Sequence, residues 1–244
     1  GLCGHGDKSS LSKSNFVLSL KMMNKMSRIN RKRNIVTVEA GAMLFDLTIY
    51  LKKNGYFIFN VPGGKNVSLG GAISGNVHGR FSSKKFANFG DNIESLKIVD
   101  EKGKIKILKK NTKLFYRVIG GQSSFGIIVE ATLRVNKIRS YSFIEKKTFI
   151  KNLKEFKKFN NNNEKYFGYL NIFDRKNFSI NCTSISPLRE DNKNISNFSM
   201  RDINLPRFFG IFLNRFSIRI LYIYLFKIKK YISRKNYQIN FEKS

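Results

Sequence analysis

Glycine is the residue whose placement says most about chemistry in this sequence, because it recurs in short clusters through the first half of the chain. Clusters stand at residues 1–7 (GLCGHGD), 62–64 (PGG), 68–71 (SLGG) and 120–121 (GG). Backbone without a Cβ lets N–H groups approach an anion such as a diphosphate, and lets a flat ring lie against the main chain. The clusters therefore predict a binding site for an anionic cofactor. A Rossmann or P-loop site is not indicated, because neither the G-x-G-x-x-G fingerprint nor the P-loop lysine motif is present.

His5 and His78 are the only histidines, so no histidine-based metal cluster exists and no metal site is predicted. His78 could act as a proton-transferring base, or it could shape the binding site by hydrogen bonding, and the second interpretation is favoured. Cys3 and Cys182 are far apart and lack the spacing of metal ligands. Two free thiols are therefore predicted rather than a disulfide framework.

Apolar periodicity predicts the strands and helices that must position the glycine clusters. Residues 93–99 and 104–108 alternate like two strands of a hairpin around the turn DEKG. Residues 42–54 carry apolar residues at helical spacing and stop at Gly55, and Ser68 is placed to cap a short helix. The other elements predicted here are strands at 15–20, 35–39, 56–61 and 126–135 and a helical turn at 113–119.

The composition changes near residue 136, where glycine becomes sparse and asparagine and phenylalanine become frequent. We therefore predict two domains, residues 1–137 and 138–244. In the second, the pattern predicts a helix at 151–159 and strands at 141–150, 166–173 and 178–183. The chain does not begin with Met and its last residues have no terminating character, so we expect a fragment at both ends.

The formal net charge of +30, from 46 Lys and Arg against 16 Asp and Glu, raises the question of an anionic partner. The basic residues are dispersed, with short clusters only at residues 31–33 and 227–230, so nucleic-acid binding is disfavoured as the main function. Attraction to anionic lipid or to a phosphate-bearing substrate is favoured. Residues 208–232 are apolar but contain Asn214, Arg215 and Arg219, which indicates an amphipathic helix on the protein's own core or on a membrane rather than a membrane span.

Four stretches together resemble the FAD-binding domain of the vanillyl-alcohol oxidase (PCMH-type) flavoprotein superfamily, with decaprenylphosphoryl-ribose oxidase-like proteins as the nearest branch. They are VEAGAMLFDL (38–47), VPGGKNVSLGGAISGNVHGR (61–80), FGDNIESLKIVDEKGKI (89–105) and LFYRVIGGQSSFGIIVEATLRV (114–135). The resemblance implies an α+β fold: a PCMH-type FAD-binding domain of mixed sheets flanked by helices, then the start of an α+β substrate domain.

The same resemblance implies which residues contact the FAD. The opening residues 1–7 would be the remainder of the family's diphosphate loop, residues 63 and 68–71 would line the flavin and its diphosphate, and residues 75–79 would pass near the isoalloxazine ring. His5 stands where the family has Tyr; some members attach the flavin covalently through a His in this loop, but non-covalent binding is favoured here. The implied cofactor-binding residues are Gly1, Gly4, His5, Gly6, Asp7, Gly63, Ser68, Leu69, Gly70, Gly71, Gly75, Asn76, Val77, His78, Gly79 and, through its backbone, Ile127.

The family's chemistry implies an FAD-dependent oxidoreductase that oxidises a CH–OH group of a sugar or lipid-linked sugar by hydride transfer to flavin N5. Two alternatives stay open: an aldonolactone or 2-hydroxy-acid oxidase of the same superfamily, and a basic nucleic-acid or membrane-surface binding module without flavin. The implied partner is a small-molecule or polyprenyl-phosphate-linked sugar, and we expect a cytoplasmic protein with peripheral membrane contact. No catalytic residue is assigned, because the family's substrate-side residues lie further toward the C-terminus.

Overall fold

The structure of the chain is a computed structural model that divides into two compact units, Gly1–Ile138 and Arg139–Ser244. It describes residues 18–64, 66–79, 85–138, 142–163, 165–170 and 179–187, together with residues 216, 217, 220 and 237–240. The division lies one residue beyond the boundary expected from composition, and each unit is described by itself.

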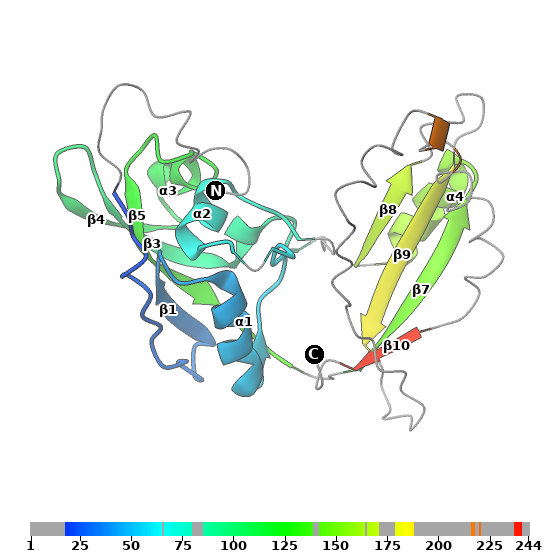
Figure 1. Cartoon of the computed structure of the whole chain (residues 1–244), viewed down its shortest axis with the longest axis horizontal. Coiled ribbons are helices and arrows are strands. Elements are labelled where there is room, and N and C mark those ends of the chain that lie inside the picture. Colours follow the sequence, from blue (N-terminus) through cyan, green and yellow to red (C-terminus); the bar gives the residue numbers. More distant parts are fainter. Residues whose placement is uncertain are drawn as a thin grey trace. The chain divides into compact units, whose positions relative to one another are not determined.

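A four-stranded antiparallel sheet forms the frame of the first unit (Figure 1). Its strands lie in the order β1 (Ile35–Glu39), β5 (Ile127–Arg134), β3 (Ile93–Val99) and β4 (Ile105–Lys109). The predicted hairpin is confirmed, with Leu96 of β3 opposite Leu108 of β4. Alternate side chains such as Val36 and Val38 are buried, so one face of the sheet supplies the core.

Three short helices complete this core. Helix α1 (Leu44–Lys53) confirms the predicted helix; it buries every third or fourth residue and ends before Gly55, whose φ of +78° favours glycine. Helix α2 (Leu69–Ser74) is capped as predicted, with the Ser68 hydroxyl accepting from the N–H of Gly71 at 3.3 Å. Helix α3 (Lys113–Val118) has a matching Thr112 cap. The largest fully buried side chains of the unit are Phe89, Phe115, Leu44, Leu47, Leu51, Leu69, Ile73, Ile93, Leu96, Ile98 and Leu133.

The segment between α1 and α2 departs from the predicted strand at 56–61. Only β2 (Tyr56–Phe57) is a strand, paired with β6 (Asn136–Lys137). At Phe59 the side chain of Asn92 replaces a strand partner: its Oδ1 accepts from Phe59 N–H at 3.2 Å and its Nδ2 donates to Phe59 O at 2.9 Å. Asn92 is fully buried at the end of the 3₁₀-helix η2 (Phe89–Asn92), and it also donates to Phe89 O. A buried side chain therefore fixes the loop that leads toward the glycines.

The predicted strand at 15–20 is wrong for residues 18–20, which are irregular, while residues 15–17 lie outside the described part of the chain. Residues 18–30 are held instead by scattered backbone hydrogen bonds along β1, such as Ser27 N–H to Thr37 O at 2.8 Å.

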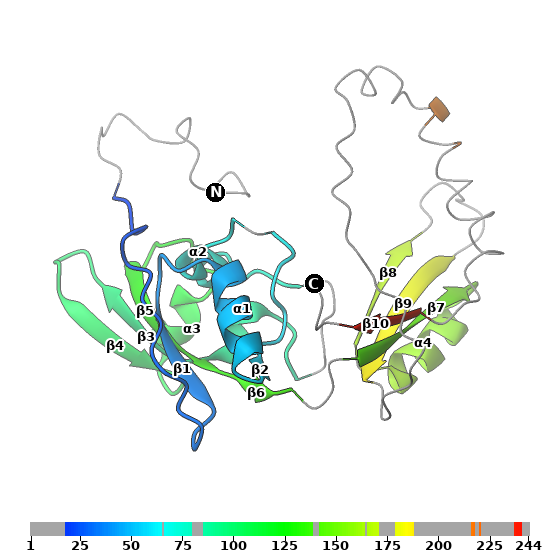
Figure 2. The same ribbon diagram turned by 60° about the horizontal axis from the view of Figure 1, so that its bottom comes forward.

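The second unit is built on another antiparallel sheet, in the order β10 (Tyr237–Asn240), β7 (Ser142–Ile150), β9 (Ile180–Pro187) and β8 (Tyr166–Leu170). Helix α4 (Leu153–Asn162) lies against this sheet (Figure 2) and shares a small core with Ile150 and Cys182. Strands β7, β8 and β9 and helix α4 confirm the predicted elements where these are described, although β9 runs from Ile180 to Pro187. Residues 171–173 of the strand predicted at 166–173 lie outside the described residues, and β10 was not predicted. The amphipathic helix expected over 208–232 falls almost entirely outside the described residues.

Within the described residues, no helix has both the length and the apolar character needed to cross a lipid bilayer.

Candidate functional site

The predicted cofactor-binding residues of the first unit gather around α2. They come from the loop before this helix, from the helix itself and from residues 75–79 after it. Ile127 stands apart at the start of β5, opposite Val99, with 37% of its surface exposed. Gly1, Gly4, His5, Gly6 and Asp7 lie outside the described residues.

The first two backbone N–H groups of helix α2 are hydrogen-bonded to the turn between β1 and α1. The N–H of Leu69 donates to Ala42 O and that of Gly70 to Ala40 O, both at 2.8 Å. The next amide, of Gly71, is taken by the capping hydroxyl. We expected these N–H groups to face a diphosphate, but they hold the helix in place and are not free to bind one.

The glycines of this region fall into two kinds, and the first is required by packing. A Cβ on Gly79 would lie 2.8 Å from Val61 O and 2.9 Å from Asn60 Cα, both backbone atoms. A Cβ on Gly70 would lie 3.0 Å from the Cβ of Ala40. At Gly79 the backbone of the protein itself excludes a side chain, and at Gly70 it leaves little room for one.

The second kind of glycine leaves room for a Cβ. A Cβ on Gly63 would meet nothing within 4 Å, and one on Gly75 would make only ordinary contacts. Within the described part of the chain, moreover, no hydrogen bond occupies the N–H of Gly63, Gly64 or His78. Since Gly79 holds residues 78–79 against residues 60–61, these free amides belong to two adjacent loops. This pair of loops is the surface that can receive an anionic or planar ligand.

A buried acceptor adds to this surface. Asn60 is 5% exposed and has a positive φ of 56°, and its Nδ2 donates to Phe86 O. Its Oδ1 is buried without a hydrogen-bond partner among the described residues. An unpaired buried acceptor is costly, about 1–3 kcal/mol. A flavin carries ribityl hydroxyl groups and a ring N–H that can donate to such an oxygen, so open glycines, free amides and this acceptor all fit the cofactor.

Asn76, in contrast, is occupied in fixing the loop after α2. Its φ is +39°, and its Oδ1 accepts from Gly90 N–H at 3.1 Å. The next residue, Val77, accepts from Phe89 N–H at 2.8 Å. His78 then projects as an exposed side chain, with Nδ1 3.4 Å from Gly79 O. The interpretation of His78 as a residue that shapes the site remains a prediction.

The loop between α3 and β5 is held against the C-terminal end of α2 in a strained conformation. Gln122 and Ser123 have φ values of 50° and 66°, a region that costs non-glycine residues free energy. The N–H of Gly120 donates to Ile73 O at 3.0 Å and that of Gln122 to Ser74 O at 3.1 Å. Such strain concentrates where ligands bind, and this loop leads directly to Ile127.

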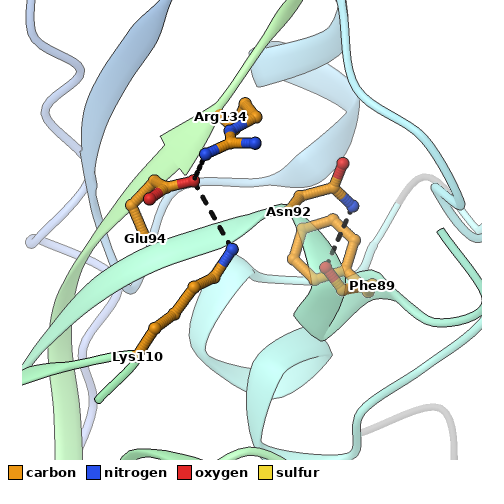
Figure 3. Close-up of polar contacts among 5 residues, drawn as sticks. All are labelled: Phe89, Asn92, Glu94, Lys110 and Arg134. Atoms are coloured by element: carbon orange, nitrogen blue, oxygen red, sulfur yellow. Dashed lines mark hydrogen bonds and ion pairs between the residues drawn. The ribbon is translucent and has the colours of Figure 1, made fainter. Parts of the chain in front are cut away.

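A pocket of about 390 Å³ is lined by Asn76 and by residues of η2, α3 and the ends of β4 and β5. Behind it, Glu94 Oε1 receives both Arg134 Nη2 at 2.7 Å and Lys110 Nζ at 3.4 Å (Figure 3). These residues were not singled out from the sequence. They are far apart in the chain, and only the register of three strands brings them together.

Cys182 is a buried free thiol, and burial raises its pKa to about 11, so it is neutral at physiological pH. Cys3 lies outside the described residues. In the described part of the chain, no group of three His, Cys, Asp or Glu residues is placed to hold a metal ion.

Comparison with known families adds a decisive observation, because residues 3–109 match the family described as FAD binding domain. Over these residues the chain is similar to an FAD-binding domain. The cofactor is therefore FAD, and the mixed α+β fold with its antiparallel sheets is the fold implied by the sequence.

The chain is also similar to an oxidase and to a dehydrogenase. The chain is 27% identical over 131 residues to the decaprenylphosphoryl-beta-D-ribose oxidase of Mycolicibacterium smegmatis. The match covers 52% of this chain and 28% of that protein. It is 29% identical over 144 residues to the mitochondrial L-galactono-1,4-lactone dehydrogenase 1 of Oryza sativa subsp. japonica. This match covers 58% of this chain and 24% of that protein. The matched stretches span about a quarter of the length of these relatives.

Among solved structures, Physcomitrella patens BBE-like 1 matches with a TM-score of 0.52 and 22% identity, covering 67% of this chain and 37% of that one. This likeness concerns the fold.

The two kinds of glycine generate a matched pair of variants. Gly79→Ala places a methyl group 2.8 Å from a backbone oxygen, so we expect it to lower the free energy of unfolding by about 1–3 kcal/mol. Gly63→Ala enters open space, so its stability should stay within about 0.5 kcal/mol of the parent while its affinity for FAD falls. Urea unfolding and FAD titration of both variants check this. Unchanged FAD affinity of a folded Gly63→Ala would remove Gly63 from the binding surface.

Proposed function

We propose that this chain is the cofactor-binding part of an FAD-dependent oxidoreductase that oxidises a CH–OH group of a sugar or lipid-linked sugar. The observation that carries the proposal is the pair of adjacent loops, 60–64 and 78–79, which have an open position at Gly63 and N–H groups without a hydrogen-bond partner among the described residues. The relatives support the substrate class, since one is named for a ribose derivative and another for a sugar lactone.

The residues of the chain would divide the work of holding the cofactor. The N–H groups of Gly63, Gly64 and His78 would donate to it, and Asn60 Oδ1 would accept from it. Gly70 and Gly79 would keep the backbone segments at the required spacing. When bound, a flavin supplies the two-electron acceptor for the oxidation of an alcohol carbon. The protein would contribute binding, orientation and the exclusion of water, and no described residue is assigned as the proton acceptor.

An aldonolactone or 2-hydroxy-acid oxidase is the second candidate. It is favoured by the L-galactono-1,4-lactone dehydrogenase relative, whose identity to this chain is close to that of the ribose oxidase. A basic binding module without flavin is disfavoured by the FAD-binding domain match.

Flavin content and flavin reduction test the proposal together. The purified protein should be yellow, absorbing near roughly 450 nm, or should become so on addition of FAD. Under anaerobic conditions this absorbance should bleach with a lipid-linked or free ribose substrate and stay unchanged with D-lactate. Bleaching by L-galactono-1,4-lactone alone would select the second candidate. A colourless protein that takes up no FAD, although folded by circular dichroism, would contradict both.

We further propose peripheral contact with an anionic membrane, in a cytoplasmic setting, through the turn that precedes β1. The turn is closed by Asn30 N–H to Ile35 O at 2.8 Å and by Arg33 N–H to Asn30 Oδ1 at 3.0 Å. It presents Arg31, Lys32 and Arg33, all exposed, and none of the ion pairs found among the described residues involves them. A convex basic turn suits a flat anionic surface, which would also be the location of a polyprenyl-phosphate-linked sugar.

Vesicle binding tests the membrane contact. Because each basic residue near an anionic bilayer contributes about 1 kcal/mol, Arg31→Gln/Lys32→Gln/Arg33→Gln should lower partitioning onto phosphatidylserine vesicles by about tenfold or more. The matched control, Lys102→Gln/Lys104→Gln/Lys109→Gln, removes three exposed charges from the β3–β4 hairpin and should have a much smaller effect. Equal losses in the two triple variants would show that only net charge matters. Stronger retention by nucleic acid than by vesicles would also contradict the proposal.

A further inference from the structure

The pocket beside η2, which we call the η2 pocket, has the composition of a ligand site. Its volume of about 390 Å³ lies in the range typical of small-molecule sites. Asn76 and Gly90 line one side, and their mutual hydrogen bond fixes that wall. Gly63 and Gly64 are not part of the lining. The pocket is therefore distinct from the free amides of the two adjacent loops.

The cationic wall of the η2 pocket is assembled from Arg134, at the end of β5, and Lys110, just after β4. The Arg134 guanidinium and the Lys110 ammonium group both contact Oε1 of Glu94, at 2.7 Å and 3.4 Å respectively (Figure 3). One carboxylate therefore holds the two cations close together. A guanidinium has five N–H donors, and this ion pair engages only one of the two terminal nitrogens. The remaining donors, beside an ammonium group, match the oxygens of a phosphate.

A third cation and one acid complete the charges that line the η2 pocket. Lys85 stands beside Phe86, with Nζ 5.9 Å from the ring centroid. Asp91 is the acid, and its Oδ2 accepts from Asn88 N–H at 2.9 Å. Three cations therefore face one lining carboxylate and the supporting Glu94. The excess is positive, so the pocket favours an anion.

Another part of the lining of the η2 pocket is aromatic. Tyr116 leaves 62% of its surface exposed although it belongs to a pocket, and its ring packs edge-on to Phe115 with centroids 5.2 Å apart. An exposed ring beside a cationic wall offers a flat apolar surface to a ligand whose charged end is held elsewhere. The two walls together fit an anion that carries an apolar or aromatic group.

We propose that the η2 pocket binds a phosphate monoester with an apolar or aromatic substituent, the phosphate at Lys110 and Arg134 and the substituent on Tyr116. This site goes beyond the proposed oxidation of an alcohol and does not depend on it. The same phosphate chemistry could come from a separate phosphate monoester or from the diphosphate of FAD itself. The absence of Gly63 and Gly64 from the lining favours a separate ligand.

Phenyl phosphate is a suitable probe, with affinity measured by isothermal titration calorimetry on the whole chain. Loss of charge-assisted hydrogen bonds to phosphate should weaken binding by about tenfold or more in Lys110→Gln/Arg134→Gln. The matched control is Lys97→Gln/Lys106→Gln, which removes two ion-paired lysines from the same sheet but outside the pocket. Its affinity should stay within about twofold of the parent. Equal weakening in both double variants, or no measurable binding to the parent, would overturn the proposal.

Two further arms keep the test decisive if the double variant folds poorly. Tyr116→Ala changes an exposed side chain, and it should weaken phenyl phosphate more than inorganic phosphate. Equal effects on the two probes would remove the aromatic wall. Saturating FAD should leave phenyl phosphate binding unchanged, whereas competition by FAD would assign the pocket to the cofactor's diphosphate and overturn a separate site. Failure of FAD uptake with intact phenyl phosphate binding would contradict only the proposed oxidoreductase.

Discussion

The close approach of Gly79 to the backbone of Asn60 and Val61 is the contact on which the cofactor surface depends. No side chain fits there, because a Cβ would lie less than 3 Å from backbone atoms. Packing at this point sets two loops side by side, and each loop keeps N–H groups that the described chain leaves unpaired. The rest of the first unit holds this contact in place. Asn92 fixes residue 59, and Asn76 fixes the loop before Gly79 to η2.

Neighbouring glycines therefore have two different roles: some allow the backbone to pack tightly, and others leave room for a ligand. Gly70 and Gly79 allow backbone segments to pack, whereas Gly63 and Gly75 leave room. The first amides of α2 take part in packing too, through Ala40 and Ala42, so the helix positions the binding surface without supplying its first donors. The basic residues divide in a similar way, because Lys110 and Arg134 are held by Glu94 while the turn at 31–33 is free of described ion pairs.

Local signals in the sequence were sufficient for most elements that are described. The apolar periodicity of α1, the Ser68 cap and the β3–β4 hairpin were predicted because each depends on residues close together in the chain. The predicted strand at 56–61 was wrong beyond Phe57, since the partner of Phe59 is a side chain 33 positions away. Such a long-range contact leaves no local pattern.

For the candidate site, the sequence predicted the region but not the individual hydrogen bonds. Glycine clusters and the resemblance to FAD-linked oxidases predicted a cofactor site around α2, and the match to the FAD binding domain includes this region without testing which residues bind the cofactor. Which amides are engaged could not be predicted, because the partners Ala40 and Ala42 belong to a turn about 28 residues earlier. The η2 pocket was missed for the same reason, since strand register alone brings Glu94, Lys110 and Arg134 together.

Amide hydrogen exchange with and without FAD tests the central claim most directly, because it measures individual backbone N–H groups. The amides of Gly63, Gly64 and His78 should exchange fast in the free protein and slow markedly when FAD is added. Those of Leu69 and Gly70 should already be slow and change little, because they donate to Ala42 and Ala40. Protection that appeared only at Leu69 and Gly70, with Gly63 and His78 unaffected, would contradict the assignment of the two loops as the cofactor surface.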